Sequence, residues 1–146
     1  LGVRSVTPLT TERCVVKTHR TEIDKKIGRC GKIALESSKQ CGRSQIPTVA
    51  ENIETLETFC RRNDNQDLKL VFWEREETKT LKDIELNAEP RSVAVLIGPE
   101  GGFSQAEIDA VRRFGFQTVS LGPRILRAET APVVALALLQ SLWGDL

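Results

Sequence analysis

The sequence contains no methionine, a single histidine and no long hydrophobic run. Its longest strongly apolar stretch, residues 133–139, is far shorter than the roughly 20 residues that a membrane-spanning helix needs. No signal-peptide pattern opens the chain, so we expect a cytoplasmic protein that does not contact membranes. Because the chain lacks methionine and starts abruptly at Leu1, we also expect a further N-terminal part.

Metal-ligating residues are sparse as well. The cysteines form no CxxC pair, and only His19 could join them as a ligand. This spacing argues against a zinc site and favours free thiols in a reducing cytosol, so we predict no metal. We expect His19 to be a solvated loop residue rather than a catalytic base. The four cysteines are Cys14, Cys30, Cys41 and Cys60.

Charge is unevenly distributed although the net charge is only +1. Residues 1–50 hold ten Lys and Arg against four Asp and Glu, whereas residues 51–91 hold seven against eleven. The basic first third is compatible with contact to phosphates, and a solvated helix face would explain the same charges. The length and composition are those of one globular domain.

Hydrophobic periodicity predicts strands that alternate with helices, which is typical of a parallel α/β sheet. The charged stretch 74–89 reads as a surface excursion, and the final helix is apolar nearly all round, which predicts burial on several sides. Ser104 and Glu107 form a capping box, Gly115 ends that helix, and Thr130 is predicted to cap the last helix with Pro132 in its first turn. The predicted strands are residues 3–9, 68–73, 92–97 and 117–121, and the predicted helices are residues 21–42, 53–60, 104–114 and 131–143.

Two loops follow predicted strand ends, at residues 98–103 (GPEGGF) and 121–130 (LGPRILRAET). Ligands bind at the carboxyl ends of strands in open α/β sheets, and glycines let them approach the backbone. The first loop lacks the spacing of a dinucleotide or phosphate loop, so local chemistry alone leaves a ligand site and a structural turn equally open.

These loops carry a more specific signal. Residues 96–104 (LIGPEGGFS) and 119–131 (VSLGPRILRAETA) resemble the C-terminal signature of the RsmE family, which methylates N3 of a uridine in 16S ribosomal RNA. Residues 1–3, 8–9, 12–13 and 40–43 resemble that family at the expected order and spacing, so the resemblance covers nearly the whole chain.

The resemblance implies a SPOUT-type parallel sheet flanked by helices, with a deep trefoil knot formed by the C-terminal segment, a rare exception to normal chain topology. It also implies that a small PUA-like RNA-binding domain precedes this domain. The expected cofactor is S-adenosyl-L-methionine, and the expected partners are 16S rRNA or the small ribosomal subunit and a second copy of the chain. The residues that the resemblance places at the cofactor are Leu96, Gly98, Pro99, Glu100, Gly101, Gly102, Leu121, Gly122, Ile125, Leu126, Arg127, Thr130 and Ala131.

Three arginines are candidates for the chemistry. Arg13 and Arg43 are expected on the RNA side, as phosphate clamps or as electrophiles that stabilise an anionic base, and Arg124 is a further catalytic candidate. Arg124, Arg127 and Glu129 could equally form a salt-bridge network that holds the knot together. Two alternatives stay open: a knotted methyltransferase for another rRNA or tRNA nucleotide, and a non-catalytic RNA-binding or dimerisation module of the same fold.

Overall fold

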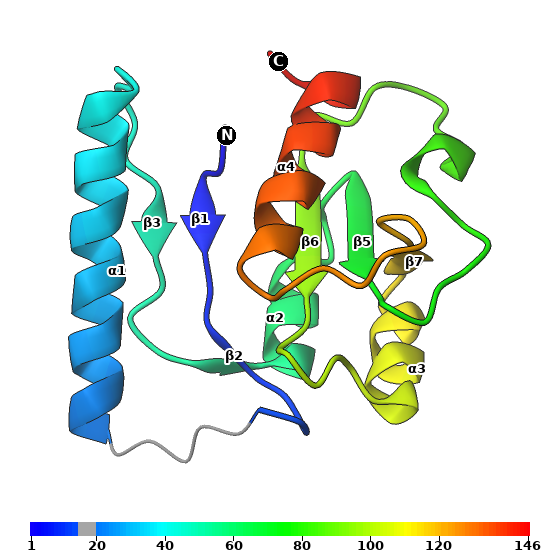
Figure 1. Ribbon diagram of the computed structural model, residues 1–146, viewed down its shortest axis with the longest axis horizontal. Coiled ribbons are helices and arrows are strands. Elements are labelled where there is room, and N and C mark those ends of the chain that lie inside the picture. The colour runs from blue at the N-terminus through cyan, green and yellow to red at the C-terminus, as the bar shows by residue number, and fades with distance from the viewer. Residues whose placement is uncertain (15–19) are drawn as a thin grey trace.

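The computed structural model describes residues 1–14 and 20–146, with side chains from residue 22 onward in the second range, so His19 lies outside the described residues. Its central feature is a three-stranded parallel sheet in the order β6 (Val93–Ile97), β5 (Leu68–Phe72), β7 (Gln117–Val119) (Figure 1). The predicted parallel α/β architecture is therefore confirmed. The strands begin or end within two residues of their predicted bounds.

The central strand is buried on both faces, as its apolar sequence LKLVF predicts for a parallel sheet. Leu68, Leu70 and Phe72 belong to one core cluster, whereas Val71 belongs to a second cluster on the opposite face. Each face of the sheet must therefore be covered by a separate set of elements.

One face is covered by α2 (Leu56–Arg62) and α3 (Gln105–Arg113), which contribute Cys60, Ile108 and Val111 to the core. Burial raises the pKa of the Cys60 thiol to about 11, so this cysteine stays protonated, and all four cysteines are free thiols. The first predicted residue of the second helix, Ile53, lies outside α2 and is 39% exposed, because Thr55 caps the helix start.

The start of α3 confirms the predicted capping box. The Glu107 amide donates to the Ser104 hydroxyl over 3.3 Å, and the Glu107 carboxylate accepts from the Ser104 amide over 2.8 Å. Gly115 follows the helix with a φ of +82°, a conformation that suits glycine.

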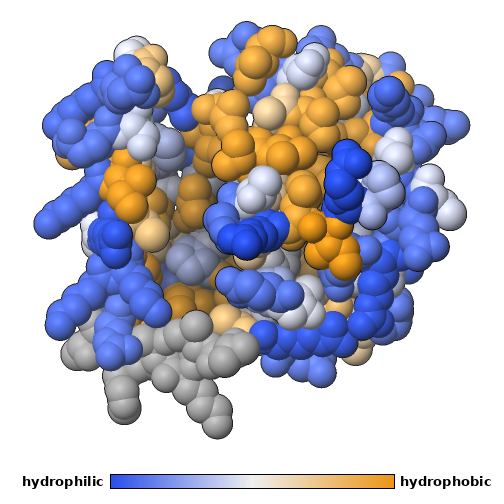
Figure 2. Space-filling view, viewed as in Figure 1, coloured by the Kyte–Doolittle hydropathy of each residue, from blue (hydrophilic) through white to orange (hydrophobic). Residues whose placement is uncertain are grey.

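The opposite face is covered by α4 (Thr130–Trp143), which buries Ala135 and Leu139. The predicted burial on several sides is wrong for the single chain, because only one side of α4 meets the sheet. Val133, Leu138 and Leu142 are 55%, 42% and 45% exposed. Figure 2 shows a hydrophobic surface in the region of this helix.

The predicted cap of α4 is also wrong. Glu129 occupies the cap position with helical backbone angles and no side-chain cap bond, and Thr130 is already the first helical residue. The Thr130 amide instead donates to the Arg127 carbonyl over 2.9 Å, so a backbone turn satisfies this group. Pro132 lies in the first turn, as predicted.

The predicted strand at residues 3–9 forms two short strands instead of one. β1 (Ser5–Val6) pairs with β3 (Thr48–Val49), and β2 (Leu9–Thr10) pairs with β4 (Glu54–Thr55), both in parallel. Pro8 lies between β1 and β2 and has no amide to donate, so the chain changes partner there.

The predicted first helix is present as α1 (Arg20–Gln40), at the side of the molecule against β3 (Figure 1). Gly42 follows it with a φ of +71°. The rest of the chain covers the apolar residues of this helix only in part, because Cys30 is exposed and Ile33 is 54% exposed. In the part of the chain that the structure describes, no helix is both long enough and apolar enough to cross a membrane.

The charged stretch 74–89 is more than a surface excursion. It contains a short 3-10 helix, η1 (Leu81–Asp83), and buries Leu81 and Ile84 against the α4 face of the sheet. Thr80 forms a parallel bridge to Ser120 just beyond β7. This segment therefore closes the sheet beside β7 and covers part of the core.

Candidate functional site

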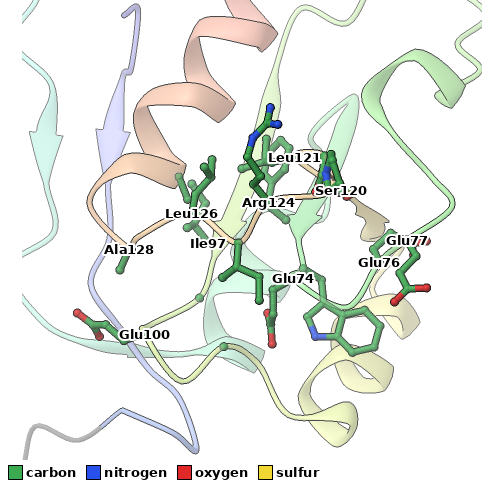
Figure 3. A pocket seen from close by; sticks show the side chains of 18 of the residues that line it. Glu74, Glu76, Glu77, Ile97, Glu100, Ser120, Leu121, Arg124, Leu126 and Ala128 are labelled. Carbon is green, nitrogen blue, oxygen red and sulfur yellow. Dashed lines mark hydrogen bonds between the residues drawn. The ribbon is translucent and has the colours of Figure 1, made fainter.

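A cavity of about 640 Å³ opens at the carboxyl ends of all three strands of the main sheet. The segments after β5, β6 and β7 form its walls, and the start of α4 contributes to it (Figure 3). Both loops singled out in the sequence thus meet at one site. The predicted cofactor residues that line the cavity are Gly98, Pro99, Glu100, Gly102, Leu121, Gly122, Ile125, Leu126 and Ala131.

Four predicted cofactor residues do not line the cavity: Leu96, Gly101, Arg127 and Thr130. Leu96 is 1% exposed and packs in the core beneath α3. Gly101 faces Arg13, since a Cβ at Gly101 would lie 3.1 Å from the Arg13 Cβ.

Gly102 is the tightest point of the first loop. Its φ is +65°, and a Cβ there would clash with the Glu74 carboxylate. The neighbouring Gly98 has little room as well, because a Cβ would lie 3.3 Å from the Gly102 Cα. The backbone conformation favours glycine at Gly102, and a larger residue would also have to displace the Glu74 carboxylate.

Arg124 is the one predicted catalytic arginine that lines the cavity. Arg127 and Glu129 form an exposed ion pair at 4.0 Å, with side chains 86% and 72% exposed, and in this geometry such a pair contributes little stability. Among the described residues, no salt bridge joins Arg124 to them, so the predicted three-residue network is absent there.

The other two arginines bind backbone carbonyls. Arg13 donates to the Gly101 carbonyl over 3.0 Å and thus lies behind the first loop. Arg43 donates to the Val3 carbonyl over 2.9 Å, which ties the chain after α1 to the start of β1. Neither lines the cavity. The structure therefore does not gather the three arginines at one point.

An acidic wall was missed from the sequence. Glu74, Glu76 and Glu77 all line the cavity, although the stretch that contains them was predicted to be a surface excursion. The rule used for the other two loops could have found them, because these residues follow the carboxyl end of β5. Further lining residues that were not predicted are Phe72, Trp73, Thr80, Ile97, Pro123, Ser120 and Ala128.

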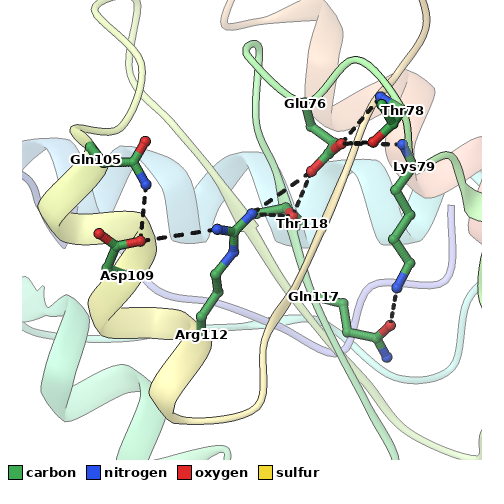
Figure 4. Close-up of polar contacts among 8 residues, drawn as sticks. All are labelled: Glu76, Thr78, Lys79, Gln105, Asp109, Arg112, Gln117 and Thr118. Atoms are coloured by element: carbon green, nitrogen blue, oxygen red, sulfur yellow. Dashed lines mark hydrogen bonds and ion pairs between the residues drawn. The ribbon is translucent and has the colours of Figure 1, made fainter.

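Glu76 is held in place by a hydrogen-bond network (Figure 4). Its carboxylate accepts from the Thr118 hydroxyl over 2.7 Å, from the Thr78 hydroxyl over 2.8 Å, and from the amides of Thr78 and Lys79 over 3.2 Å. These bonds, led by that from Thr118, lower the pKa of Glu76 to about 2. Glu76 therefore stays ionised and fixes the acidic wall to β7.

The network continues to the indole at the back of the cavity. Arg112 donates to the Thr118 hydroxyl over 2.9 Å, and its guanidinium lies 5.9 Å from the centre of the Trp73 ring. The Trp73 indole nitrogen is buried and has no hydrogen-bond partner among the described residues. One arginine on α3 thus contacts both the carboxylate network and the aromatic wall.

The composition of the cavity defines its ligand class. Apolar side chains such as Ile97, Leu121 and Leu126 provide a slot for a flat group. The charged lining consists of four glutamates, Glu100 included, and one arginine. Carboxylates disfavour a phosphate and favour a ligand that carries positive charge or hydrogen-bond donors. No three His, Cys, Asp or Glu side chains gather to hold a metal ion in residues 1–14 and 20–146 as described. The fold and site define a parallel α/β protein that binds a small organic ligand at its strand ends.

Comparison with known proteins identifies the class more closely. The RNA methyltransferase domain family matches residues 1–140. A ribosomal RNA small subunit methyltransferase E from Buchnera aphidicola (subsp. Acyrthosiphon pisum) is 37% identical over 99% of this chain and 56% of its own length. The enzyme of the same name from Bacillus subtilis is 32% identical over 94% of this chain and 55% of its own length.

Two solved structures show the same fold. A putative methyltransferase from Legionella pneumophila, in complex with the cofactor SAM, has a TM-score of 0.89 and 42% identity, over 99% of this chain and 58% of that chain. A ribosomal RNA small subunit methyltransferase E from Neisseria gonorrhoeae, bound to S-adenosyl methionine, has a TM-score of 0.87 and 34% identity, over the same shares.

This chain belongs to the RNA methyltransferase domain family, as its resemblance to the RsmE enzymes predicted. It spans slightly more than half the length of the curated relatives it matches.

Proposed function

We propose that this chain is the catalytic domain of an S-adenosylmethionine-dependent methyltransferase that acts in the cytoplasm on N3 of a uridine in 16S rRNA. The observation that carries the proposal is the single cavity formed by both signature loops at the carboxyl ends of the strands. The names of the relatives and the bound cofactor in two similar structures support it.

The cavity fits S-adenosylmethionine by chemistry. Its apolar slot suits the adenine ring, and backbone groups of the partly buried Gly98 can bind the edge of the ring. The carboxylates of Glu74 and Glu76 suit the positively charged end of the molecule. When bound, the cofactor supplies a methyl group already activated by positively charged sulfur.

The residues of the chain then have to position and shield the acceptor. Holding the reacting groups in line can remove roughly 7 to 11 kcal/mol from a reaction barrier. The uracil N3 proton must also leave, and Arg124 at the cavity can stabilise the negative charge on the base. Arg13, fixed on Gly101, and Arg43 remain our proposed RNA-side contacts.

The substrate is tested with small ribosomal subunits whose 16S rRNA lacks the modification. A methyl group on N3 blocks Watson–Crick pairing, so reverse transcription should stop at one uridine after incubation with full-length protein and cofactor. Arg124→Gln should weaken the stop, whereas Arg113→Gln on the outside of α3 should not. Methyl transfer to another nucleotide would support the alternative RNA substrate, and cofactor binding without transfer to any RNA would support a non-catalytic module.

We also propose that the chain forms a homodimer through α4. Leu138 and Leu142, one turn apart, leave an exposed apolar strip on this helix, which a second copy would cover, and the helix lies under the hydrophobic surface in Figure 2. Leu126 and Ile125 belong to the adjacent loop, and Ile125 is 83% exposed although it lines the cavity. Sedimentation of this chain at micromolar concentration should show twice its mass of 16.2 kDa, and a 16.2 kDa species alone would refute the dimer.

A C-terminal knot is a further part of the proposal. β7 pairs with β5 on one side, and on its other side the Ser120 amide donates to the Lys79 carbonyl over 2.7 Å. β5 and Lys79, the two partners of the β7 segment, both belong to the continuous segment 68–97. This segment ends in β6, which lies on the side of β5 opposite β7. This arrangement supports threading of the C-terminal segment through a loop. Mechanical unfolding from both ends should release less contour length than an unknotted chain of 146 residues.

A further inference from the structure

The first signature loop, residues 98–103, is held from outside the cavity by the turn that follows β2. Residues 11–14 form this turn, in which the Cys14 amide donates to the Thr11 carbonyl over 3.1 Å. Arg13 in the turn and Gly101 in the loop are 88 residues apart in the sequence. They meet at the end of the molecule toward which β6 runs (Figure 1), so this contact depends on the tertiary fold.

One peptide group of the loop has both of its polar atoms hydrogen-bonded. Its carbonyl, from Gly101, accepts from the Arg13 guanidinium over 3.0 Å. Its amide, from Gly102, donates to the Pro99 carbonyl over 2.8 Å. Pro99 and Gly102 both line the cavity. The bond to Pro99 closes the loop on itself, whereas the bond from Arg13 fixes the loop to a distant part of the protein.

The absence of a side chain at Gly101 is explained by Arg13 rather than by the cavity. Gly101 does not line the cavity, and its φ lies outside the positive range that favours glycine at Gly102. A Cβ at Gly101 would lie 3.1 Å from the Arg13 Cβ and 3.5 Å from the Arg13 carbonyl oxygen. This signature glycine therefore lets the turn approach the outer side of the loop.

A second hydrogen bond links the same turn to the far end of the loop. The Glu107 carboxylate accepts from the Ser104 amide over 2.8 Å with one oxygen and from the Glu12 amide over 2.7 Å with the other. Ser104 directly follows the loop and caps α3. The turn is thus linked to the exposed middle of the loop at Gly101 and, through Glu107, to its buried end.

We propose that Arg13 is a positioning residue for the cofactor, because its bond to the Gly101 carbonyl holds the first loop in the shape that binds S-adenosylmethionine. The inference rests on the proposed function, since it takes the ligand of the cavity to be S-adenosylmethionine. A loop that is ordered before binding loses less conformational entropy when the ligand arrives. The bond uses one terminal nitrogen of the guanidinium, so the proposed contact between Arg13 and RNA is compatible with it.

Calorimetric titration of S-adenosylmethionine into full-length protein without RNA separates this role from an RNA contact. Arg13→Met removes the donor and keeps a long side chain, whereas Arg13→Lys keeps one charged donor. Arg62→Met is the matched control. Arg62 donates to the Thr7 hydroxyl over 3.0 Å and so also joins distant segments, but it neither lines the cavity nor bonds to the loop. Urea unfolding gives the stability of each variant.

Arg13→Met should raise the Kd for S-adenosylmethionine about tenfold, which corresponds to about 1.4 kcal/mol and is within the range of a hydrogen bond from a charged group. Arg13→Lys should restore the affinity to within a factor of about three of the wild type, less than 1 kcal/mol. Arg62→Met should lose stability and yet keep the wild-type cofactor affinity within that same factor.

Gly101→Ala tests the contact from its other side. The new methyl group pushes Arg13 away, so this variant should also bind the cofactor more weakly, although Gly101 does not line the cavity. The double variant Arg13→Met with Gly101→Ala should bind about as weakly as the weaker single variant, because both changes break the same bond. If Arg13→Met does not fold, Gly101→Ala and Arg13→Lys measured against Arg62→Met decide the question.

Several results would overturn the positioning role and leave the proposed function in place. These are wild-type cofactor affinity in Arg13→Met, an equal loss in Arg62→Met, no rescue by Arg13→Lys, and fully additive losses in the double variant. Unchanged cofactor affinity in Arg13→Met together with weaker binding to small ribosomal subunits would leave Arg13 with an RNA contact alone. Wild-type protein that binds no S-adenosylmethionine would instead overturn the proposed function.

Discussion

Replacement of Glu76 by Gln should remove stability in a way that depends on pH. The hydrogen bonds to Glu76 lower its pKa from the ordinary value of 4.5 to about 2, and its side chain is only 12% exposed. Each pKa unit corresponds to about 1.4 kcal/mol, so the folded state gains about 3 kcal/mol from ionised Glu76. Because the pKa is lowered on folding, this stabilisation is complete above the unfolded value and is lost progressively between about pH 5 and pH 2.

Urea unfolding of the wild type and of Glu76→Gln at several pH values measures this term directly. The difference in free energy of unfolding should be about 3 kcal/mol at pH 7 and should shrink toward zero near pH 2. Glu77→Gln is the matched control, since that neighbour is exposed and makes none of these hydrogen bonds. A difference for Glu76→Gln that stays constant from pH 7 to pH 2 would refute the assignment of this network.

Two further predictions concern residues far from the acidic wall. Gly28→Ala should raise the free energy of unfolding by about 0.5 to 1 kcal/mol, because Gly28 lies inside α1 and a Cβ there meets nothing within 4 Å; thermal unfolding checks this, and a lower midpoint would contradict the described helix. Arg43→Ala should cost about 1.5 to 3 kcal/mol of stability through loss of its bond to the Val3 carbonyl. It should also lower methylation by the full-length enzyme more than cofactor affinity, and equal loss in both would exclude an RNA-side role.

The sequence predicted the main sheet well because its strands are continuous apolar runs and its loops carry glycine. Residues 93–97 and 68–72 could hardly pack except as buried parallel strands, and the ends of these strands fixed where a ligand binds. Local patterns thus placed both loops at strand ends, although they left a ligand site and a structural turn equally open. The family resemblance added the identity of the ligand, which periodicity alone could not supply.

The failures of prediction came from tertiary contacts. Because residues 74–89 are highly charged, the sequence did not predict burial of Leu81 and Ile84, which pack in the core cluster that includes residues of α4. It also did not predict the role of Glu76, whose hydrogen-bond partner Thr118 is distant in sequence. The apolar sequence of α4 indicated burial, but the sheet covers only one side of the helix. Helical spacing cannot tell which neighbours a single chain provides and which require a second copy.

Calorimetric titration of S-adenosylmethionine into full-length protein tests most directly whether the cavity is the cofactor site. Wild-type protein should bind saturably at one site per chain. Gly102→Ala should bind much more weakly, because the new methyl group displaces Glu74 and strains a φ of +65°, whereas Gly28→Ala should bind as the wild type does. Absence of binding in folded wild-type protein, or equal affinity in Gly102→Ala, would contradict the assignment of this cavity as the cofactor site.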